Sequence, residues 1–169
     1  MNTLVTDRLV LRPVREDDAQ AVYRNWSTDE RVAEHCTWHP HKNIDVTKAY
    51  IEHCIKMEYC WAITLKGSDE PIGIIEVVGK NSAGVDELGY VLMHDQWGKG
   101  IMTEAVKAVI KELFELGFEK VGACHHTDNP ASGKVMRKSG MKFVRSGEIK
   151  RKFDSDELIP IDIYEISKN

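Results

Sequence analysis

The middle of the chain places a helix between two strand-like segments, and this order constrains the fold more than any other feature. Segment 86–93 (DELGYVLM) leads through a glycine-containing turn, WGKGIM, into a strongly amphipathic helical pattern that Gly117 ends. Segment 120–126 (KVGACHH) is strand-like again. A strand, a crossover helix and a second strand form a βαβ unit, so we predict that the two strands are parallel neighbours.

The remaining segments extend this unit into one mixed sheet. Strand patterns cover residues 3–13, 60–66, 71–79, 142–153 and 159–167, and helical patterns cover 16–26, 28–36, 45–57 and the stretch from Asn129 to Gly140. Short polar turns separate 60–66, 71–79 and 86–93, which favours an antiparallel meander. We therefore predict an α/β (α+β) fold with a central mixed sheet of six or seven strands, antiparallel in its first half and parallel in its middle, and about four helices.

Length, charge and cysteine usage exclude several classes of protein. The 169 residues suit a single domain over residues 1–169. The net charge of -4 argues against a nucleic-acid partner, and no apolar run approaches the roughly 20 residues of a membrane helix. The 4 cysteines include no C-x-x-C pair, so we expect a reduced, cytoplasmic protein. One segment contains three histidines and a cysteine close together, His35, Cys36, His39 and His41. Their spacing matches no standard zinc pattern, and no metal is expected.

The glycine turn matches neither common nucleotide motif. WGKGIM is not part of a G-x-x-x-x-G-K-[ST] loop, and Thr103 stands where a dinucleotide fingerprint requires its third glycine. What remains is a helix start, where free N–H groups and the helix dipole favour an anion such as phosphate. Gly98 and Gly100 would let the backbone approach that anion, and Lys99 would add charge. A plain strand-to-helix connection is the alternative that the turn alone leaves open.

Together these segments resemble the GNAT N-acetyltransferase superfamily, and most closely its subgroup of ribosomal-protein N-terminal acetyltransferases of the RimJ/RimL type. The resemblance covers nearly the whole chain and rests on TDRLVLRPVREDDAQAVY, PIGIIEV, ELGYVLMHDQWGKGIMTEAV, DNPASGKVMRKSGMKFVRSG and IDIYEIS. It implies the GNAT fold and acetyl-CoA as the co-substrate. The pyrophosphate of that co-substrate is then expected on the backbone amides of Gly98, Lys99, Gly100, Ile101, Met102 and Thr103.

The same resemblance implies further contacts with the cofactor. Backbone groups of Val91, Leu92 and Met93 are expected to pair with the pantetheine arm, as a strand added to an open sheet edge would. Asn129 and Ser132 are expected near the pantetheine and its thiol, and Lys134 at the nucleotide end. Met102 departs from the small residue usual in the family. Either that small residue is needed for backbone approach and cofactor binding is weakened, or the Met102 side chain faces the core, which we expect.

A second departure concerns the catalytic groups. Many family members carry a tyrosine general acid where this chain has Met136, so Ser132 is expected to hydrogen-bond the leaving thiol, unless it bonds only within its own helical turn. Glu87 is the candidate base and Glu76 the second choice. The alternative is that either carboxylate is a surface charge at the end of a strand, and such an enzyme need not have a dedicated base.

Four aromatic or imidazole side chains are candidates to line the pocket for the amine acceptor. Trp38 and His39 are expected to form walls of an acceptor pocket, and Trp26 and Tyr164 are candidates there or members of the core. The predicted function is transfer of an acetyl group to a primary amine by direct attack, the acceptor being either a protein N-terminus or a small amine. The alternative is a catalytically silent acyl-CoA-binding or sensor module. Because dimers are common in the family, a homodimer is compatible with the resemblance.

Overall fold

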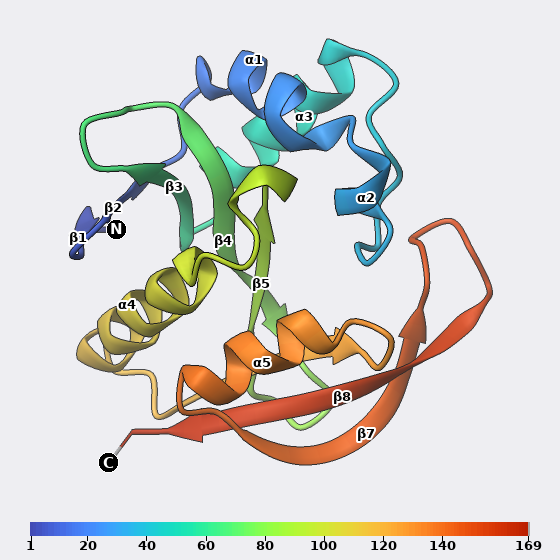
Figure 1. Ribbon diagram of the computed structural model, residues 1–169. Helices are drawn as coiled ribbons and strands as arrows, with labels where there is room; N and C mark the ends of the chain where they lie inside the picture. The colour runs from blue at the N-terminus through green and yellow to red at the C-terminus, as the bar shows by residue number, and fades with distance from the viewer. Residues whose placement is uncertain (169) are drawn as a thin grey trace.

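The computed structural model describes residues 1–168 and contains one eight-stranded mixed sheet (Figure 1). The strands follow the order β1-β2-β3-β4-β5-β6-β8-β7 across the sheet. Their bounds are β1 Leu4–Val5, β2 Leu9–Pro13, β3 Cys60–Leu65, β4 Pro71–Lys80, β5 Asp86–Leu92, β6 Lys120–His126, β7 Lys142–Lys150 and β8 Leu158–Ser167. Neighbouring strands are antiparallel except β5 and β6, which are parallel. The predicted fold class and the parallel middle of the sheet are therefore confirmed.

The eighth strand arises because the predicted strand 3–13 folds back on itself. The Thr6 N–H donates to the Leu9 carbonyl at 3.0 Å, and the Leu9 N–H donates to the Thr6 hydroxyl oxygen at 3.0 Å. This side-chain bond closes a turn, so β1 pairs antiparallel with β2 and places Leu4 opposite Leu11. The alternating pattern over 3–13 predicts strand structure correctly but does not reveal the turn inside it.

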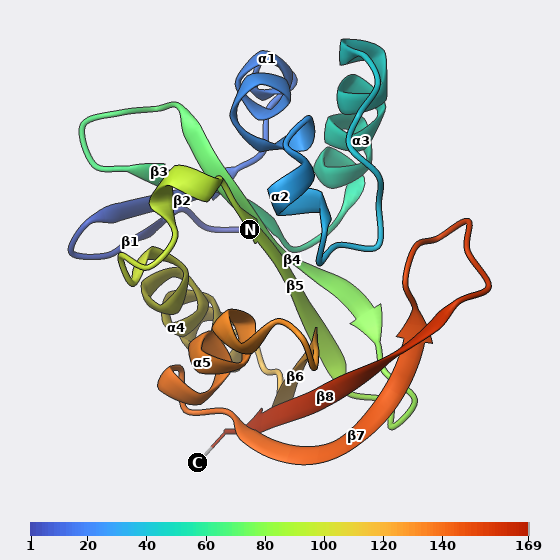
Figure 2. The same ribbon diagram turned by 45° about the vertical axis from the view of Figure 1, so that its right-hand side comes forward.

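Five α-helices cover the two faces of the sheet. They are α1 Asp18–Val22, α2 Glu30–Ala33, α3 Ile44–Lys56, α4 Ile101–Glu115 and α5 Pro130–Lys138, and a π-helical segment, Tyr23–Ser27, extends α1. Asn129 caps α5 by accepting the Ser132 N–H, and Pro130 takes the first helical position. Helices α1 to α3 lie on one face of the sheet, and α4 and α5 lie on the other (Figures 1 and 2).

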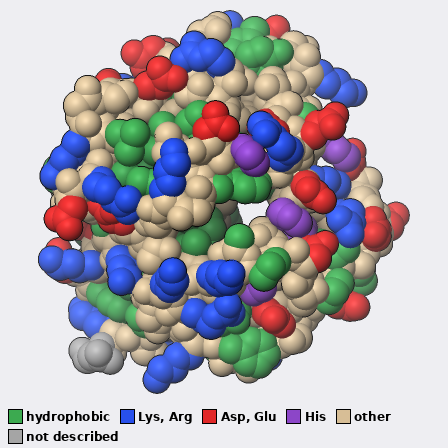
Figure 3. Space-filling view, in the orientation of Figure 1, with side chains coloured by type: hydrophobic (Ala, Val, Ile, Leu, Met, Phe, Trp, Pro, Cys, Tyr) green, Lys and Arg blue, Asp and Glu red, His purple; other side chains and the backbone are tan. Residues whose placement is uncertain are grey.

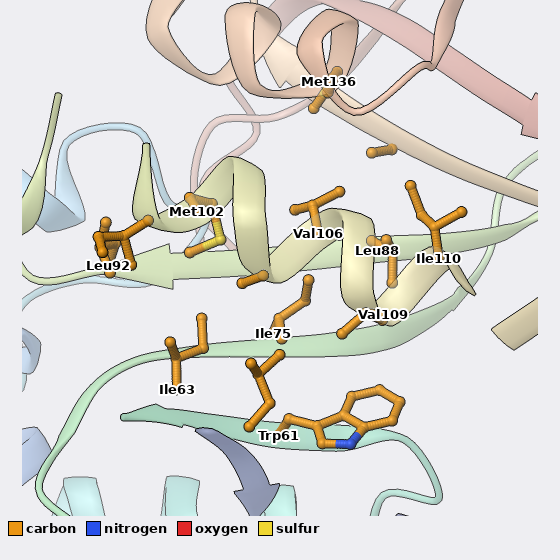
Figure 4. Close-up of a cluster of buried hydrophobic side chains, with 14 of the residues drawn as sticks. Trp61, Ile63, Ile75, Leu88, Leu92, Met102, Val106, Val109, Ile110 and Met136 are labelled. Carbon is orange, nitrogen blue, oxygen red and sulfur yellow. The ribbon is translucent and has the colours of Figure 1, made fainter. Parts of the chain in front are cut away.

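Each face of the sheet has its own hydrophobic core. One core contains Met102, Val106 and Val109 of α4, Met136 of α5 and sheet residues such as Ile75 (Figure 4). The other core packs α1, the π-helical segment and α3 against β3 and β4. Burial on both faces explains why β3 and the first half of β4 are buried without alternation.

The two central strands pair only at one end. β5 and β6 are in register at Asp86 with Val121 and at Glu87 with Gly122, and they pair no further. Beyond that point β5 follows its antiparallel partner β4, while β6 follows β8 as far as His126. Figure 2 shows the two halves of the sheet diverging from this point. The fold thus leaves an open backbone edge on β5 in the middle of the molecule.

Candidate active site

The first turn of α4 presents backbone amides at the end of β5. Gly98 and Gly100 have φ of 74° and 76°, a left-handed conformation that glycine adopts at little cost. Within residues 1–168 no side chain caps this helix start, so its first N–H groups are available to an anion. Arg8 holds the turn in place, because its Nη1 donates to the Lys99 carbonyl at 2.9 Å and its Nε to Glu104 at 2.7 Å.

The side chain of Met102 faces the core, as the sequence analysis expected. It is 6% exposed and packs beneath α4 with the apolar side chains of the sheet (Figure 4). Ile101 is buried in the same way at 3%. Because neither side chain projects toward the open side of the turn, a large residue at 102 leaves the amides of this turn accessible.

The open edge of β5 differs from the expected set of Val91, Leu92 and Met93. The Met93 N–H already donates to the Ile72 carbonyl at 2.8 Å, and its carbonyl accepts from the Gln96 N–H at 3.1 Å. Both backbone groups of Met93 are thus bonded within the chain, so the strand geometry favours other positions for the pantetheine contact, and Met93 stays a prediction. Backbone groups alternate in direction along a strand, so Val91, like Met93, faces β4, and Leu92 faces the gap.

The same alternation turns the backbone of Tyr90, two residues before Leu92, toward the gap between β5 and β6. The Leu92 carbonyl is used by the indole N–H of Trp97 at 2.8 Å, which leaves the Leu92 N–H for a ligand. Tyr90 was missed as a backbone position because the sequence shows that a strand has an open edge but not which residues face it.

A pair of hydroxyl groups lies across the gap between the central strands. The Tyr90 hydroxyl on β5 is 2.7 Å from the Ser132 hydroxyl and 3.3 Å from the Ser132 carbonyl on α5. Burial raises the pKa of Tyr90, although the Ser132 hydrogen bond opposes that shift. The Ser132 N–H donates to Asn129 Oδ1 at 3.2 Å, so the cap fixes the serine on its helix. The serine hydroxyl therefore bonds to a neighbouring strand and not within its own turn.

Two carboxyl groups lie on the face of the sheet that carries α1 to α3. Glu87 stands where β5 and β6 begin to separate, and burial raises its pKa while Asn81 and Arg145 oppose the shift. Glu76 on β4 is more deeply buried, and its pKa is raised to about 7 by desolvation. The Cys60 thiol lies 3.9 Å from a Glu76 carboxylate oxygen. Glu87 is thus next to the gap, whereas Glu76 packs against the cysteines beneath α3.

Two of the four candidate acceptor residues belong to the core. Trp26 is 1% exposed and packs among the side chains of α1 and α3 in the second core. Tyr164 is 5% exposed, and its hydroxyl accepts from Arg137 Nη1 at 2.9 Å on the α5 side of the sheet. Both residues therefore take the core alternative that the sequence left open, because their aromatic rings fill the two layers between helices and sheet.

The other two candidates lie on the loop between α2 and α3. Trp38 is half-buried, with its ring 5.4 Å from that of His41, and its carbonyl accepts from Lys152 Nζ at 3.0 Å. His39 is exposed and places Nε2 2.9 Å from Asp154 Oδ1. Since Lys152 and Asp154 belong to the connection between β7 and β8, this connection and the α2–α3 loop are tied together beside the gap.

The space-filling view shows an opening near the centre of the molecule (Figure 3). Lys and Arg side chains gather below it over α5, and histidines lie to its right. Lys134 is one of the exposed cations of α5.

Residues 8–142 match the family model described as "Acetyltransferase (GNAT) domain". The chain belongs to the GNAT family. A relative from Bacillus subtilis (strain 168), "Uncharacterized N-acetyltransferase YoaA", is 29% identical over 157 residues and covers 88% of this chain and 86% of its own. Every helix in the described residues is too short or too polar to cross a membrane.

Solved structures of GNAT proteins share the fold of this chain. A GNAT-family acetyltransferase from Bacillus anthracis aligns with a TM-score of 0.84 at 22% identity and covers 98% of both chains. The RimL ribosomal L7/L12 alpha-N-protein acetyltransferase in complex with coenzyme A aligns with a TM-score of 0.81 at 18% identity, again over 98% of both chains. At these identities the likeness shows that the chain shares their fold.

Proposed function

We propose that this chain is an N-acetyltransferase that moves an acetyl group from acetyl-CoA to a primary amine, either a protein N-terminus or a small amine. One observation carries the proposal. An open strand edge leads from an uncapped helix start with two left-handed glycines to the hydroxyl pair of Tyr90 and Ser132. An anion site, an extended amide-binding edge and a hydroxyl donor in this order fit the pyrophosphate, the pantetheine and the thiol of coenzyme A.

The residues at each point support this fit. The amides from Gly98 to Thr103 surround the helix start, and the inward Met102 side chain leaves them accessible. The Leu92 N–H faces the gap and is the backbone donor proposed for a pantetheine carbonyl. Lys134 is exposed on α5 and supplies a positive charge for the nucleotide phosphates. Asn129 is proposed to act mainly by capping the helix that carries Ser132.

Acetyl-CoA supplies an activated thioester, and the reaction exchanges its C–S bond for a C–N bond. The amine must lose a proton and the departing thiolate must gain one. We propose that the Ser132 hydroxyl hydrogen-bonds the departing sulfur and stabilises it as a thiolate. The thiolate then takes up a proton from water, which balances the proton that the amine gives up to its base. Burial keeps the Tyr90 phenol protonated. We propose that the phenol donates to Ser132 Oγ, 2.7 Å away, so that the serine proton can point at the sulfur. A backbone N–H of the open edge, at Tyr90 or Leu92, would stabilise the oxyanion.

Glu87 is the proposed base for the amine. Its raised pKa, caused by burial, brings a carboxylate closer to the range in which it accepts a proton effectively. It lies on the face opposite α5, so an amine entering from the side of the α2–α3 loop meets it before the thioester. Trp38 and His39 border this entrance, and we propose that they contact the acceptor. Glu76 is less suitable, because it is packed against Cys60 beneath α3.

A two-step experiment separates the enzyme from the silent acyl-CoA-binding module. In the first step, acetyl-CoA at many times a typical dissociation constant should raise the melting temperature of the chain. No stabilisation would remove the cofactor assignment. In the second step, release of free CoA is measured with amino acids, polyamines, aminoglycosides and N-terminal peptides. Turnover with any of them identifies the acceptor class, whereas binding without thiol release across the panel supports the silent module.

A further inference from the structure

We propose that His35, His126 and Asp128 form a binding site for a divalent transition-metal ion such as Zn²⁺. His35 follows α2, whereas His126 ends β6 and Asp128 lies in the connection to α5. One ligand atom from each residue lies within 4.8 Å of the other two. Two imidazoles and a carboxylate are a ligand set that zinc binds in proteins, with a fourth position left for water. The site takes no part in the proposed acetyl transfer.

His126 is the residue that points most directly to a ligand. It is 4% exposed, and its Nδ1 has no hydrogen-bond partner among residues 1–168. A buried polar atom without a partner costs free energy that a metal bond would offset.

The other two residues complete the ligand set from the more accessible side. His35 Nδ1 lies 3.6 Å from Asp128 Oδ1, and the rings of His35 and His126 meet edge to face with centroids 6.1 Å apart. Tetrahedral zinc with bonds of about 2.0–2.2 Å requires its ligand atoms to be somewhat closer than 4.8 Å. The Asp128 side chain is 61% exposed and can make this adjustment by rotating.

The histidine-rich loop supplies only one of these ligands. His39 is engaged with Asp154, His41 Nδ1 lies 2.8 Å from the Thr47 hydroxyl, and the Cys36 thiol donates to the Val32 carbonyl at 3.3 Å. The residues that are close in sequence are therefore already bonded elsewhere. Only His35 turns toward the end of β6, where the metal-ligating partners come from a distant part of the chain.

Nearby cations limit the expected affinity. The positive charges of Lys152 and Arg151 interact electrostatically with His126. Lys152 is fixed there because its Nζ donates to three backbone carbonyls, those of Ala33, Cys36 and Trp38, at 2.6, 2.8 and 3.0 Å. The positive charge of Lys152 and Arg151 opposes a second cation, while Asp128 contributes the only carboxylate of the ligand set. We therefore expect micromolar rather than nanomolar binding. A bound ion would tie the segment after α2 to the connection that leads into α5.

The test is a titration of the purified, metal-free chain with Zn²⁺ against a chromophoric chelator, without acetyl-CoA. The wild-type chain should bind one ion, and tetrahedral Co²⁺ should give its visible ligand-field absorption. Asp128→Asn and His35→Gln should each weaken binding by at least the roughly 10–100-fold that second-shell changes typically cause. His39→Gln removes a comparable exposed histidine paired with an aspartate and should leave the affinity unchanged.

Three results would overturn the site. They are no saturable binding at submillimolar Zn²⁺, equal affinity of Asp128→Asn and the wild-type chain, or equal weakening by His39→Gln. The two ligand variants are at exposed or half-buried positions, so a folding defect of a His126 variant does not affect the test. The titration needs neither acetyl-CoA nor an acceptor. A chain that does not bind zinc could therefore still transfer acetyl groups, and a chain that transfers none could still bind zinc.

Discussion

The hydroxyl pair of Tyr90 and Ser132 is the smallest unit on which the proposed chemistry depends. Tyr90→Phe keeps the buried ring but removes the hydroxyl bonded to Ser132, so in the proposed arrangement the serine proton is no longer directed at the sulfur. We expect kcat to fall roughly tenfold, equivalent to about 1.4 kcal/mol of transition-state stabilisation, with KM for acetyl-CoA nearly unchanged. Steady-state thiol release measures both constants.

A matched control and a double variant make this prediction specific. Tyr59 places its hydroxyl on Glu58 at the surface, so Tyr59→Phe should leave kcat unchanged. Ser132→Ala should lower kcat more than it weakens acetyl-CoA binding. The double variant with Tyr90→Phe should lower kcat only slightly further, since the two groups act as a unit. An unchanged kcat in Tyr90→Phe would show that the phenol contributes packing but no catalysis. If the two single variants lower kcat by factors that multiply in the double variant, the two hydroxyl groups act independently.

At the scale of secondary-structure elements, the contact between α5 and β6 positions Ser132. A Cβ atom at Gly133 would lie 2.6 Å from Nε2 of His125, closer than two unbonded atoms can remain. The His125 ring cannot easily move, because its Nδ1 donates to the His126 carbonyl at 2.7 Å. Glycine at 133 therefore allows the first turn of α5 to lie directly on the end of β6.

Gly133→Ala should move this turn away from β6. Overpacking costs about 1–3 kcal/mol, partly offset by the roughly 1 kcal/mol that alanine gains over glycine in a helix. We expect a lower free energy of unfolding in urea and a lower kcat, because Ser132 shifts with its neighbour. Gly147→Ala on β7 is the control, since a Cβ there meets its nearest atom at 3.6 Å, an ordinary contact. Equal stability of the two variants would contradict close packing at Gly133.

At the scale of the whole molecule, the buried carboxyl of Glu76 makes global stability depend on pH. Burial raises its pKa from 4.5 to about 7 in the folded chain. The folded chain therefore holds a proton that the unfolded chain releases in this interval. The stability contributed by this protonation is complete below pH 4.5 and is lost as pH rises through about 7, with a full size of about 3 kcal/mol.

Glu76→Gln should remove most of this dependence. Its free energy of unfolding, measured by urea denaturation between pH 5 and 8, should vary less with pH than that of the wild-type chain. Glu148→Gln on the exposed side of β7 should leave the wild-type slope intact. A wild-type slope that persists in Glu76→Gln would assign the effect to another group, of which Glu87 is the nearest candidate.

Most of the elements could be predicted from the sequence because their signals are local. The period of apolar residues and the caps at Asn129 and Gly140 place α4 and α5, and the βαβ order predicts the parallel neighbours β5 and β6. The inward side chain of Met102 belongs here too, since its position on the helix sets its direction. These features depend on geometry within one element or one connection, which neighbouring residues determine.

The tertiary structure decided which distant residues meet. The separation of β5 from β6 exposes the edge at Tyr90 and Leu92, and the packing of α5 brings Ser132 to the Tyr90 hydroxyl. It also placed Trp26 and Tyr164 in the cores. Within residues 1–168 it left Nδ1 of His126 without a hydrogen-bond partner, beside residues from the other half of the chain. The physical reason is that strand register and helix docking are set by long-range packing, to which local periodicity contributes no information. The sequence alone determined the elements and the family, whereas the side chains that face the gap follow only from how those elements pack.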